Sequence, residues 1–239
     1  MSEAPALDTG VEYPTRDGRP VAETPLHYRR LADAAHALTM RFEARPDAYV
    51  GVNMLVYDER GNPRRHLSPD VFVAFGVEDR ERDIYKLWED ESPAFVLEVT
   101  SKTTRREDRR KKARYARWGV AEYFLYDPRG EYLKPALKGF ELSGSGYCAM
   151  ATAVLPNGKP GFPSKTLGLG LWLDGSELRL CDAGTGRNLA TPKEAELGKV
   201  QADARAIAAE ARAAAAEATA TAQAERVRQL AAELARLKG

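Results

Sequence analysis

Cysteine and histidine are scarce in this 239-residue sequence, and no long apolar run occurs near its start. Its two cysteines, Cys148 and Cys181, lie far apart and match none of the metal-binding or redox spacings. Two isolated thiols favour a reducing compartment. The early residues Glu3, Asp8 and Glu12 are acidic, so the N-terminus has the character of neither a secretory signal nor a membrane-spanning helix. We therefore expect a cytoplasmic protein with no membrane partner.

The sequence also lacks the usual marks of a serine or histidine active site. Its three histidines, His27, His36 and His66, share no spacing, and we interpret them as structural or surface residues. Ser101 has no Gly-x-Ser-x-Gly elbow around it and no histidine placed by sequence to activate it. A turn or capping role is the expected one for Ser101.

An excess of charge of either sign is absent, because the formal net charge is only +1. Any role with nucleic acids must therefore come from local clustering. One short segment does contain such a cluster, made of Lys102, Arg105, Arg106, Arg109, Arg110, Lys111, Lys112, Arg114 and Arg117. A solvated helix face is the more common explanation of a basic run in general.

The most informative residues are two acids, Asp70 and Glu98, each inside an apolar run. The β-branched and aromatic residues around them predict buried strands, where an unpaired charge is strongly disfavoured. If the strands are neighbours, both carboxylates can share one divalent cation. Mg²⁺ suits such a pair, because it needs only one or two protein carboxylates and completes its shell with water and phosphate oxygens. Asp70 could instead cap the turn at Pro69.

The basic segment predicts a helix with one informative face. Asp108, Lys111, Lys112 and Tyr115 stand at i, i+3, i+4 and i+7, which puts them on one side. A lysine there could stabilise negative charge that develops on a phosphate. The alternative is an ordinary surface ion pair between Asp108 and Lys111 or Lys112.

The pattern along the chain predicts an α+β domain flanked by two other segments. Residues 1–23 read as a flexible arm, 24–189 as the folded domain, and 190–239 as an Ala-rich helical tail. Within the domain we expect a helix from Thr24-Pro25 with Leu31, Ala35, Leu38 and Phe42 on one face, then a strand over 49–57, the strand of Asp70, a loop over 76–92 and the strand of Glu98. A second helix, capped by Thr103 or Thr104, should run to about Trp118 and end at Gly119. A strand over 122–127 follows, and then antiparallel strands near 138–142, 147–150, 169–173 and 177–180.

The tail is a strong helix former whose Val227, Leu230, Leu234 and Leu237 have the spacing of a coiled-coil seam. Because its middle offers mostly alanine, little apolar surface would be buried there. Homo-oligomer formation through this helix and a monomeric helix are both open.

The motifs resemble those of the Uma family of restriction-endonuclease-like proteins, in the PD-(D/E)XK nuclease superfamily. The resemblance covers about residues 24–185 and rests on Pro69-Asp70, on Glu98-Val99-Thr100-Ser101, on the helix start at 104–108 and on the turn at 119–123. It implies a core of a helix, a three-stranded meander, a crossing helix and a fourth strand, with Asp70 and Glu98 as metal ligands.

One position departs from the superfamily pattern. The lysine expected two residues after the second acid is replaced by Thr100. The resemblance implies that Lys111 on the following helix takes the role, with Lys112 in reserve and Lys102 as a weaker substitute.

The resulting expectation is a Mg²⁺-dependent endonuclease, with Mn²⁺ as a possible substitute, that hydrolyses DNA. Asp70, Glu98 and Lys111 are the candidate catalytic residues, and Arg105, Arg106, Arg109, Arg110 and Lys112 the candidate phosphate contacts. The alternatives are a catalytically inactive nuclease fold that serves as an interaction module, and a DNA-binding module that does not cleave.

Overall fold

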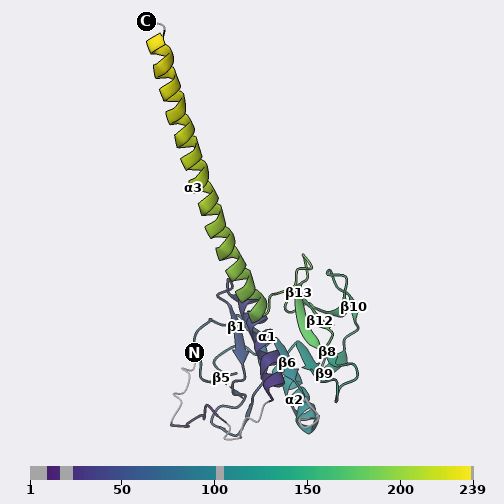
Figure 1. Ribbon diagram of the computed structural model, residues 1–239. Coiled ribbons are helices and arrows are strands. Elements are labelled where there is room, and N and C mark those ends of the chain that lie inside the picture. The colour runs from purple at the N-terminus through teal and green to yellow at the C-terminus, as the bar shows by residue number, and fades with distance from the viewer. Residues whose placement is uncertain (1–9, 17–23, 101–104, 238–239) are drawn as a thin grey trace. The chain divides into compact units, whose positions relative to one another are not determined.

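The computed structural model of the protein describes residues 10–16, 24–100 and 105–237, with side chains in the last range from Asp108 onward (Figure 1). Most of the predicted arm therefore lies outside the described residues, as do Ser101, Lys102, Thr103 and Thr104. The chain divides into two units, Met1–Thr191 and Pro192–Gly239.

Helix α1 (Pro25–Phe42) begins where the sequence predicts. The Thr24 hydroxyl accepts a hydrogen bond from the His27 amide, and Pro25 occupies the first turn, where a missing N–H costs nothing. Leu31, Ala35, Leu38 and Phe42 are all buried, which confirms the predicted core face. This helix packs on the main sheet.

The main sheet has six strands in the order β1-β4-β6-β7-β8-β9. Their bounds are β1 (Ala48–Val52), β4 (Val71–Phe75), β6 (Phe95–Val99), β7 (Glu122–Tyr126), β8 (Leu137–Ser143) and β9 (Gly146–Ala149). All neighbours are antiparallel except β6 and β7. That parallel pair needs a crossover, which α2 (Arg105–Trp118) supplies before Gly119 ends it at a φ of 80°.

The central strands β4, β6 and β7 are buried on both faces, and residue parity along the strands decides which face a side chain joins. Val71, Val73 and Leu97 pack in the core that includes α1. Their neighbours Phe72 and Val96 pack in the other core, which includes Tyr115 of α2. Glu98 has the parity of Val96, so the chain presents this acid to the α2 face.

Two smaller sheets complete the first unit. The strands β10 (Ala153–Val154), β11 (Pro160–Ser164), β12 (Leu169–Asp174) and β13 (Glu177–Asp182) form an antiparallel sheet, whereas β2 (Val56–Tyr57), β3 (His66–Leu67) and β5 (Tyr85–Lys86) form a three-stranded one. Buried Glu122 of β7 accepts hydrogen bonds from Ser164, Lys165 and Thr166, which ties the main sheet to the second one.

Two sequence-based predictions are wrong in this region. The segment 49–57 is not one strand, because Asn53 adopts a left-handed φ of 47° and separates β1 from β2. Asparagine tolerates that conformation better than most residues, which makes it a suitable break point. The segment 76–92 is not only a loop, since β5 pairs in parallel with β2.

The described part of the arm, residues 10–16, has no regular secondary structure. Its Tyr13 ring lies edge-on to Tyr57, with centroids 5.0 Å apart, and the Tyr13 hydroxyl accepts a hydrogen bond from the Gly61 amide. Tyr57 in turn donates to the Pro14 carbonyl. These contacts hold residues 13 and 14 against β2 and the turn that follows it.

The second unit is one helix, α3 (Pro192–Leu237), which Figure 1 shows without a break. None of its side chains is buried. Over the residues that the structure describes, no helix combines the length and the apolar character that crossing a bilayer requires.

Candidate active site

Asp70 and Glu98 lie at the same end of two neighbouring strands. The β4–β6 register pairs Val71 with Leu97, and one further step places Asp70 opposite Glu98. Both are buried, with 8% and 3% of their surface exposed. Asp70 Oδ2 accepts a hydrogen bond of 2.7 Å from the Val99 amide, so this carboxylate reaches across to the end of β6. The structure therefore brings the two predicted acids together at one end of two adjacent strands, with Asp70 directly before β4 and Glu98 within β6.

Helix α2 supplies two donors to Glu98. Lys111 Nζ lies 2.7 Å from Glu98 Oε2 and donates also to the Ser68 carbonyl at 3.0 Å. The Tyr115 hydroxyl donates to Glu98 Oε1 at 2.5 Å. Lys111 and Tyr115 are four residues apart, so both project from one face of the helix. Burial, together with the negative charge of Glu98, raises the pKa of Tyr115 far above its usual value, which keeps this donor protonated.

Thr100, at the position where the superfamily pattern has lysine, bonds to α2 instead. Its hydroxyl donates to Asp108 Oδ2 at 2.6 Å, and its amide donates to the Tyr126 carbonyl. Asp108 is buried, and this burial raises its pKa to about 6 against the opposing effect of the Thr100 hydrogen bond. Glu98 adds to the rise through its negative charge, and Lys111 opposes it.

The basic residues of α2 have different surroundings from one another. Arg109 and Arg110 are exposed. Lys112 places its ammonium 3.3 Å from the centroid of the Phe140 ring, and burial lowers its pKa. The side chains of Arg105 and Arg106 lie outside the described residues. Of the predicted phosphate contacts, the structure thus leaves Arg109 and Arg110 at the surface and gives Lys112 a packing contact.

Arg114, also in the basic run, belongs to a buried ion pair. Its guanidinium makes two hydrogen bonds of 2.7 Å to Asp58, to which the Trp118 indole also donates. Burial raises the pKa of Asp58, but the bonds from Arg114 and Trp118 outweigh it and hold that pKa below its usual value. Two parallel N–H bonds to one carboxylate are the geometry that arginine favours. This pair anchors the C-terminal half of α2 to the segment after β2.

His27 is the site neighbour that the sequence did not indicate. Its Nε2 lies 3.9 Å from Asp70 Oδ2. The residue stands in the first turn of α1, and only the packing of α1 beside the start of β4 brings it to Asp70. No spacing in the sequence connects the two positions.

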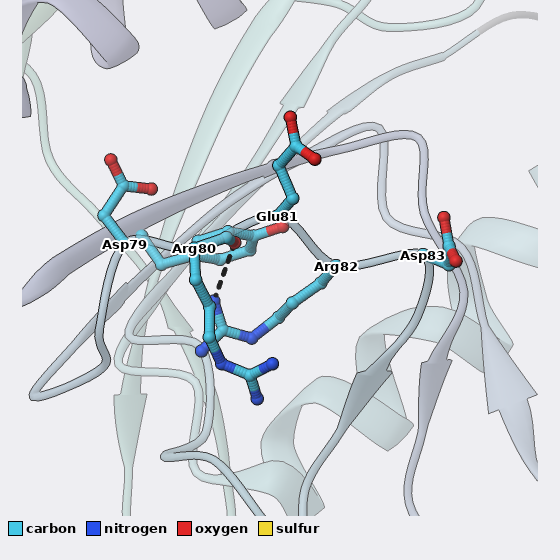
Figure 2. A pocket seen from close by; sticks show the side chains of 6 residues that line it. Asp79, Arg80, Glu81, Arg82 and Asp83 are labelled. Atoms are coloured by element: carbon cyan, nitrogen blue, oxygen red, sulfur yellow. Dashed lines mark hydrogen bonds between the residues drawn. The ribbon is translucent and has the colours of Figure 1, made fainter.

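A surface pocket lies away from these acids, beside Tyr49 and residues 79–83 (Figure 2). Arg82 folds back there, with its guanidinium 4.6 Å from the Tyr49 ring centroid and bonded to the Arg80 carbonyl. It also pairs with Asp90 at 3.0 Å, with 3% of the Arg82 side chain exposed. The acidic segment is therefore organised around a buried arginine, and this pocket holds none of the predicted site residues.

The donor chemistry of the acid pair fits Mg²⁺ or Mn²⁺. Within the described part of the chain, no three His, Cys, Asp or Glu side chains are grouped closely enough to hold a metal ion. Mg²⁺ commonly takes only one or two protein carboxylates, and each carboxylate oxygen has a second lone pair beyond the hydrogen bond it accepts. Asp70 and Glu98 therefore meet the ligand requirement of Mg²⁺. A structural zinc centre would need four protein ligands, which this pair does not supply.

The architecture is that of an α+β protein with a six-stranded mixed sheet and two buried acids at one end of its central strands. Residues 3–174 match the Uma2 family, described as "Putative restriction endonuclease". The chain belongs to this family of restriction-endonuclease-like proteins, in which divalent metals are generally used. The matched range ends in β12, so α3 lies outside it.

A solved structure from Anabaena variabilis ATCC 29413, described as "a putative nuclease belonging to DUF820", is also similar to this chain. The two are 11% identical with a TM-score of 0.41, and the similarity covers 54% of this chain and 68% of that one. No relative was found among curated proteins. The family assignment rests on the sequence match.

Proposed function

We propose that this protein is a divalent-metal-dependent endonuclease that hydrolyses phosphodiester bonds in DNA, with Mg²⁺ as the preferred ion and Mn²⁺ as a substitute. The observation that supports it most is the meeting of three side chains at one end of the sheet. Asp70 stands opposite Glu98, and the Lys111 ammonium lies 2.7 Å from Glu98. Packing alone does not require two acids and one cation from separate elements to lie together.

In this proposal Asp70 and Glu98 hold the ion. Once bound, Mg²⁺ supplies Lewis-acid stabilisation of negative charge on a phosphate. The chain's own groups do the rest. Lys111 stabilises the charge that develops on the phosphate during attack by water, and Tyr115 fixes the orientation of Glu98 through its short hydrogen bond.

The exposed arginines of α2 extend the site toward the DNA backbone. Arg109 and Arg110 are exposed on the same helix that supplies Lys111. Arg105 and Arg106 precede them by one turn, and we assign all four to phosphate attraction. Lys112 is assigned to packing because its ammonium faces Phe140.

A plasmid assay combined with calorimetry tests the proposal. The purified chain is expected to cleave plasmid with Mg²⁺ or Mn²⁺ and to lose this activity in EDTA. Asp70→Asn and Glu98→Gln, which keep the side-chain shape, should abolish both cleavage and divalent-ion binding. Lys111→Met should lower the rate by about 100-fold or more while the ion still binds.

Asp174→Asn, at an exposed acid of the second sheet, is the matched control and should behave as the unaltered chain. Cleavage that persists in the Glu98→Gln protein would remove the mechanism. Circular dichroism of each variant separates a lost site from a lost fold.

Thr100 gives one alternative a specific basis, because the position of the superfamily lysine bears a hydroxyl bonded to Asp108. A catalytically inactive nuclease fold that serves as an interaction module would bind no divalent ion in the calorimeter. A DNA-binding module without cleavage would bind DNA with a steep salt dependence and would be indifferent to EDTA.

A further inference from the structure

Helix α3 is a long helix that packs against nothing in its own unit. It spans 46 residues, which corresponds to roughly 70 Å of length at 1.5 Å per residue. Every side chain on it is exposed, including Val227, Leu230, Leu234 and Leu237, which are 65%, 45%, 55% and 81% exposed. Large apolar side chains repeated on one face of a helix are typical of a surface that packs against another helix.

These four residues define a heptad frame. Val227 and Leu234 take the a positions, and Leu230 and Leu237 the d positions. Carried toward the N-terminus, the same frame meets Gln223 and then alanine at each core position, namely Ala220, Ala216, Ala213, Ala209, Ala206 and Ala202. The frame therefore continues over most of the helix with small residues at its seam, and the apolar anchor lies near the C-terminal end.

The two flanks of that seam carry opposite charges over its alanine-rich part. In the e positions stand Asp203, Glu210 and Glu217, one heptad apart. In the g positions stand Arg205 and Arg212, followed by Thr219, Arg226 and Glu233. Over residues 203–217, one edge of the seam is thus acidic and the other basic.

This arrangement selects both the partner and its direction. In a parallel pair, each g residue faces the e residue five positions later on the other helix, so Arg205 meets Glu210 and Arg212 meets Glu217 of a second copy. In an antiparallel pair, g faces g and e faces e, which would place like charges together. Only the parallel, in-register arrangement satisfies both edges at once.

We propose that α3 associates with α3 of a second copy of this chain as a parallel, in-register two-stranded coiled coil. Its apolar seam is Val227, Leu230, Leu234 and Leu237, and its charged edges fix the direction. Since Pro192 begins α3 immediately after the first unit, the parallel pairing joins two copies of that unit at the same end of the coil.

A charge-exchange experiment on the full chain tests the partner. Sedimentation equilibrium should give a concentration-dependent dimer of the 26.3 kDa chain. Arg205→Glu/Arg212→Glu makes both edges acidic, and Glu210→Arg/Glu217→Arg makes both basic; each protein alone should associate at least about tenfold more weakly. An equimolar mixture of the two should recover the dimer. A monomeric unaltered chain, or variants that dimerise as strongly as it does, would overturn the proposal.

Cysteine cross-linking tests the direction. In a Cys148→Ser background, Ala202→Cys and Ala216→Cys each place a thiol in the seam, whereas Ala204→Cys and Ala218→Cys place it on the outer f positions as matched controls. A parallel, in-register pair oxidises to a covalent dimer at both seam positions and at neither control. An antiparallel pair can do so at one seam position at most, and that result would also overturn the proposal.

Discussion

Glu98 is the residue around which the site is arranged, and its neighbour Asp108 shows what burial does to an acid there. Glu98 receives hydrogen bonds from a lysine and a tyrosine. Asp108 is almost as deeply buried, but it accepts a hydrogen bond from a neutral hydroxyl, that of Thr100. Burial raises the pKa of Asp108 to about 6, so its charge is costly at neutral pH.

Asp108→Asn should stabilise the chain above pH 6. Because the folded pKa of about 6 exceeds the unfolded value of 3.8, the folded chain keeps a proton that the unfolded chain loses between these values. The free energy of unfolding therefore falls as the pH rises from about 4 to about 6. The asparagine, which can still accept from Thr100, removes this loss.

Urea unfolding at pH 4 and pH 8 measures the effect. The variant and the unaltered chain should differ little at pH 4 and by roughly 2–3 kcal/mol at pH 8, at about 1.4 kcal/mol per pKa unit. A difference that is the same at both pH values would contradict the prediction.

Helix α2 has a different role on each of three sides. Its sheet-facing side holds Lys111 and Tyr115 at Glu98, its C-terminal half is anchored through Arg114, and its exposed side bears Arg109 and Arg110. Arginine is the residue type both at the anchor and on the exposed side. The buried Arg114 stabilises the fold, whereas we assign the exposed Arg109 and Arg110 to phosphate binding.

Arg114→Met should destabilise the first unit by about 3 kcal/mol. The change removes both bonds to Asp58 and leaves a buried carboxylate with fewer donors, and breaking one partner of a buried pair has this cost. Thermal and urea unfolding report it. A loss under about 0.5 kcal/mol, the range of an ordinary surface change, would show that the pair contributes little.

Arg109→Gln/Arg110→Gln should leave unfolding almost unchanged and weaken DNA binding. Both side chains are exposed, and if each neutralises one phosphate, the slope of log affinity against log salt should fall by about 2, equally for different DNA sequences. Fluorescence anisotropy over a salt series measures the slope. The prediction is wrong if the slope stays as it was while affinity for one sequence alone changes.

The whole chain combines a nuclease-family unit with a helix that lies beyond the family match. If two copies join through α3, the assembly holds two candidate sites, one for each strand of a duplex. The single unit would instead cut one strand per encounter. Association through α3 then has a functional consequence, because it brings two candidate sites together.

Leu230→Glu/Leu234→Glu should convert double-strand cleavage into nicking. Two buried charges at the seam separate the helices, whereas the first unit keeps its site and its stability. With supercoiled plasmid and Mg²⁺, the unaltered chain is expected to give linear product early and the variant to give open circles first. Equal fractions of linear product from both proteins would argue against a role for the coil in cleavage.

Several elements could be predicted because their causes are local. Thr24 and Pro25 begin α1 and Gly119 ends α2, since capping and a left-handed φ depend on a few adjacent residues. Asp70 and Glu98 could be predicted as candidate site residues because an acid inside an apolar strand needs a partner, whichever group supplies it. The break at Asn53 and the pairing of β5 with β2 were missed, because short strands depend on distant neighbours.

The chain's own pattern thus determined where helices and strands lie, which acids are unusual and how the two edges of α3 are charged. Tertiary packing alone decided that Lys111 meets Glu98, that Lys112 lies over Phe140 and that Arg114 pairs with Asp58. These cations sit within four residues of one helix, where each step turns the side chain by about 100°. Their roles therefore follow from what each direction meets, and that depends on residues far away in the chain.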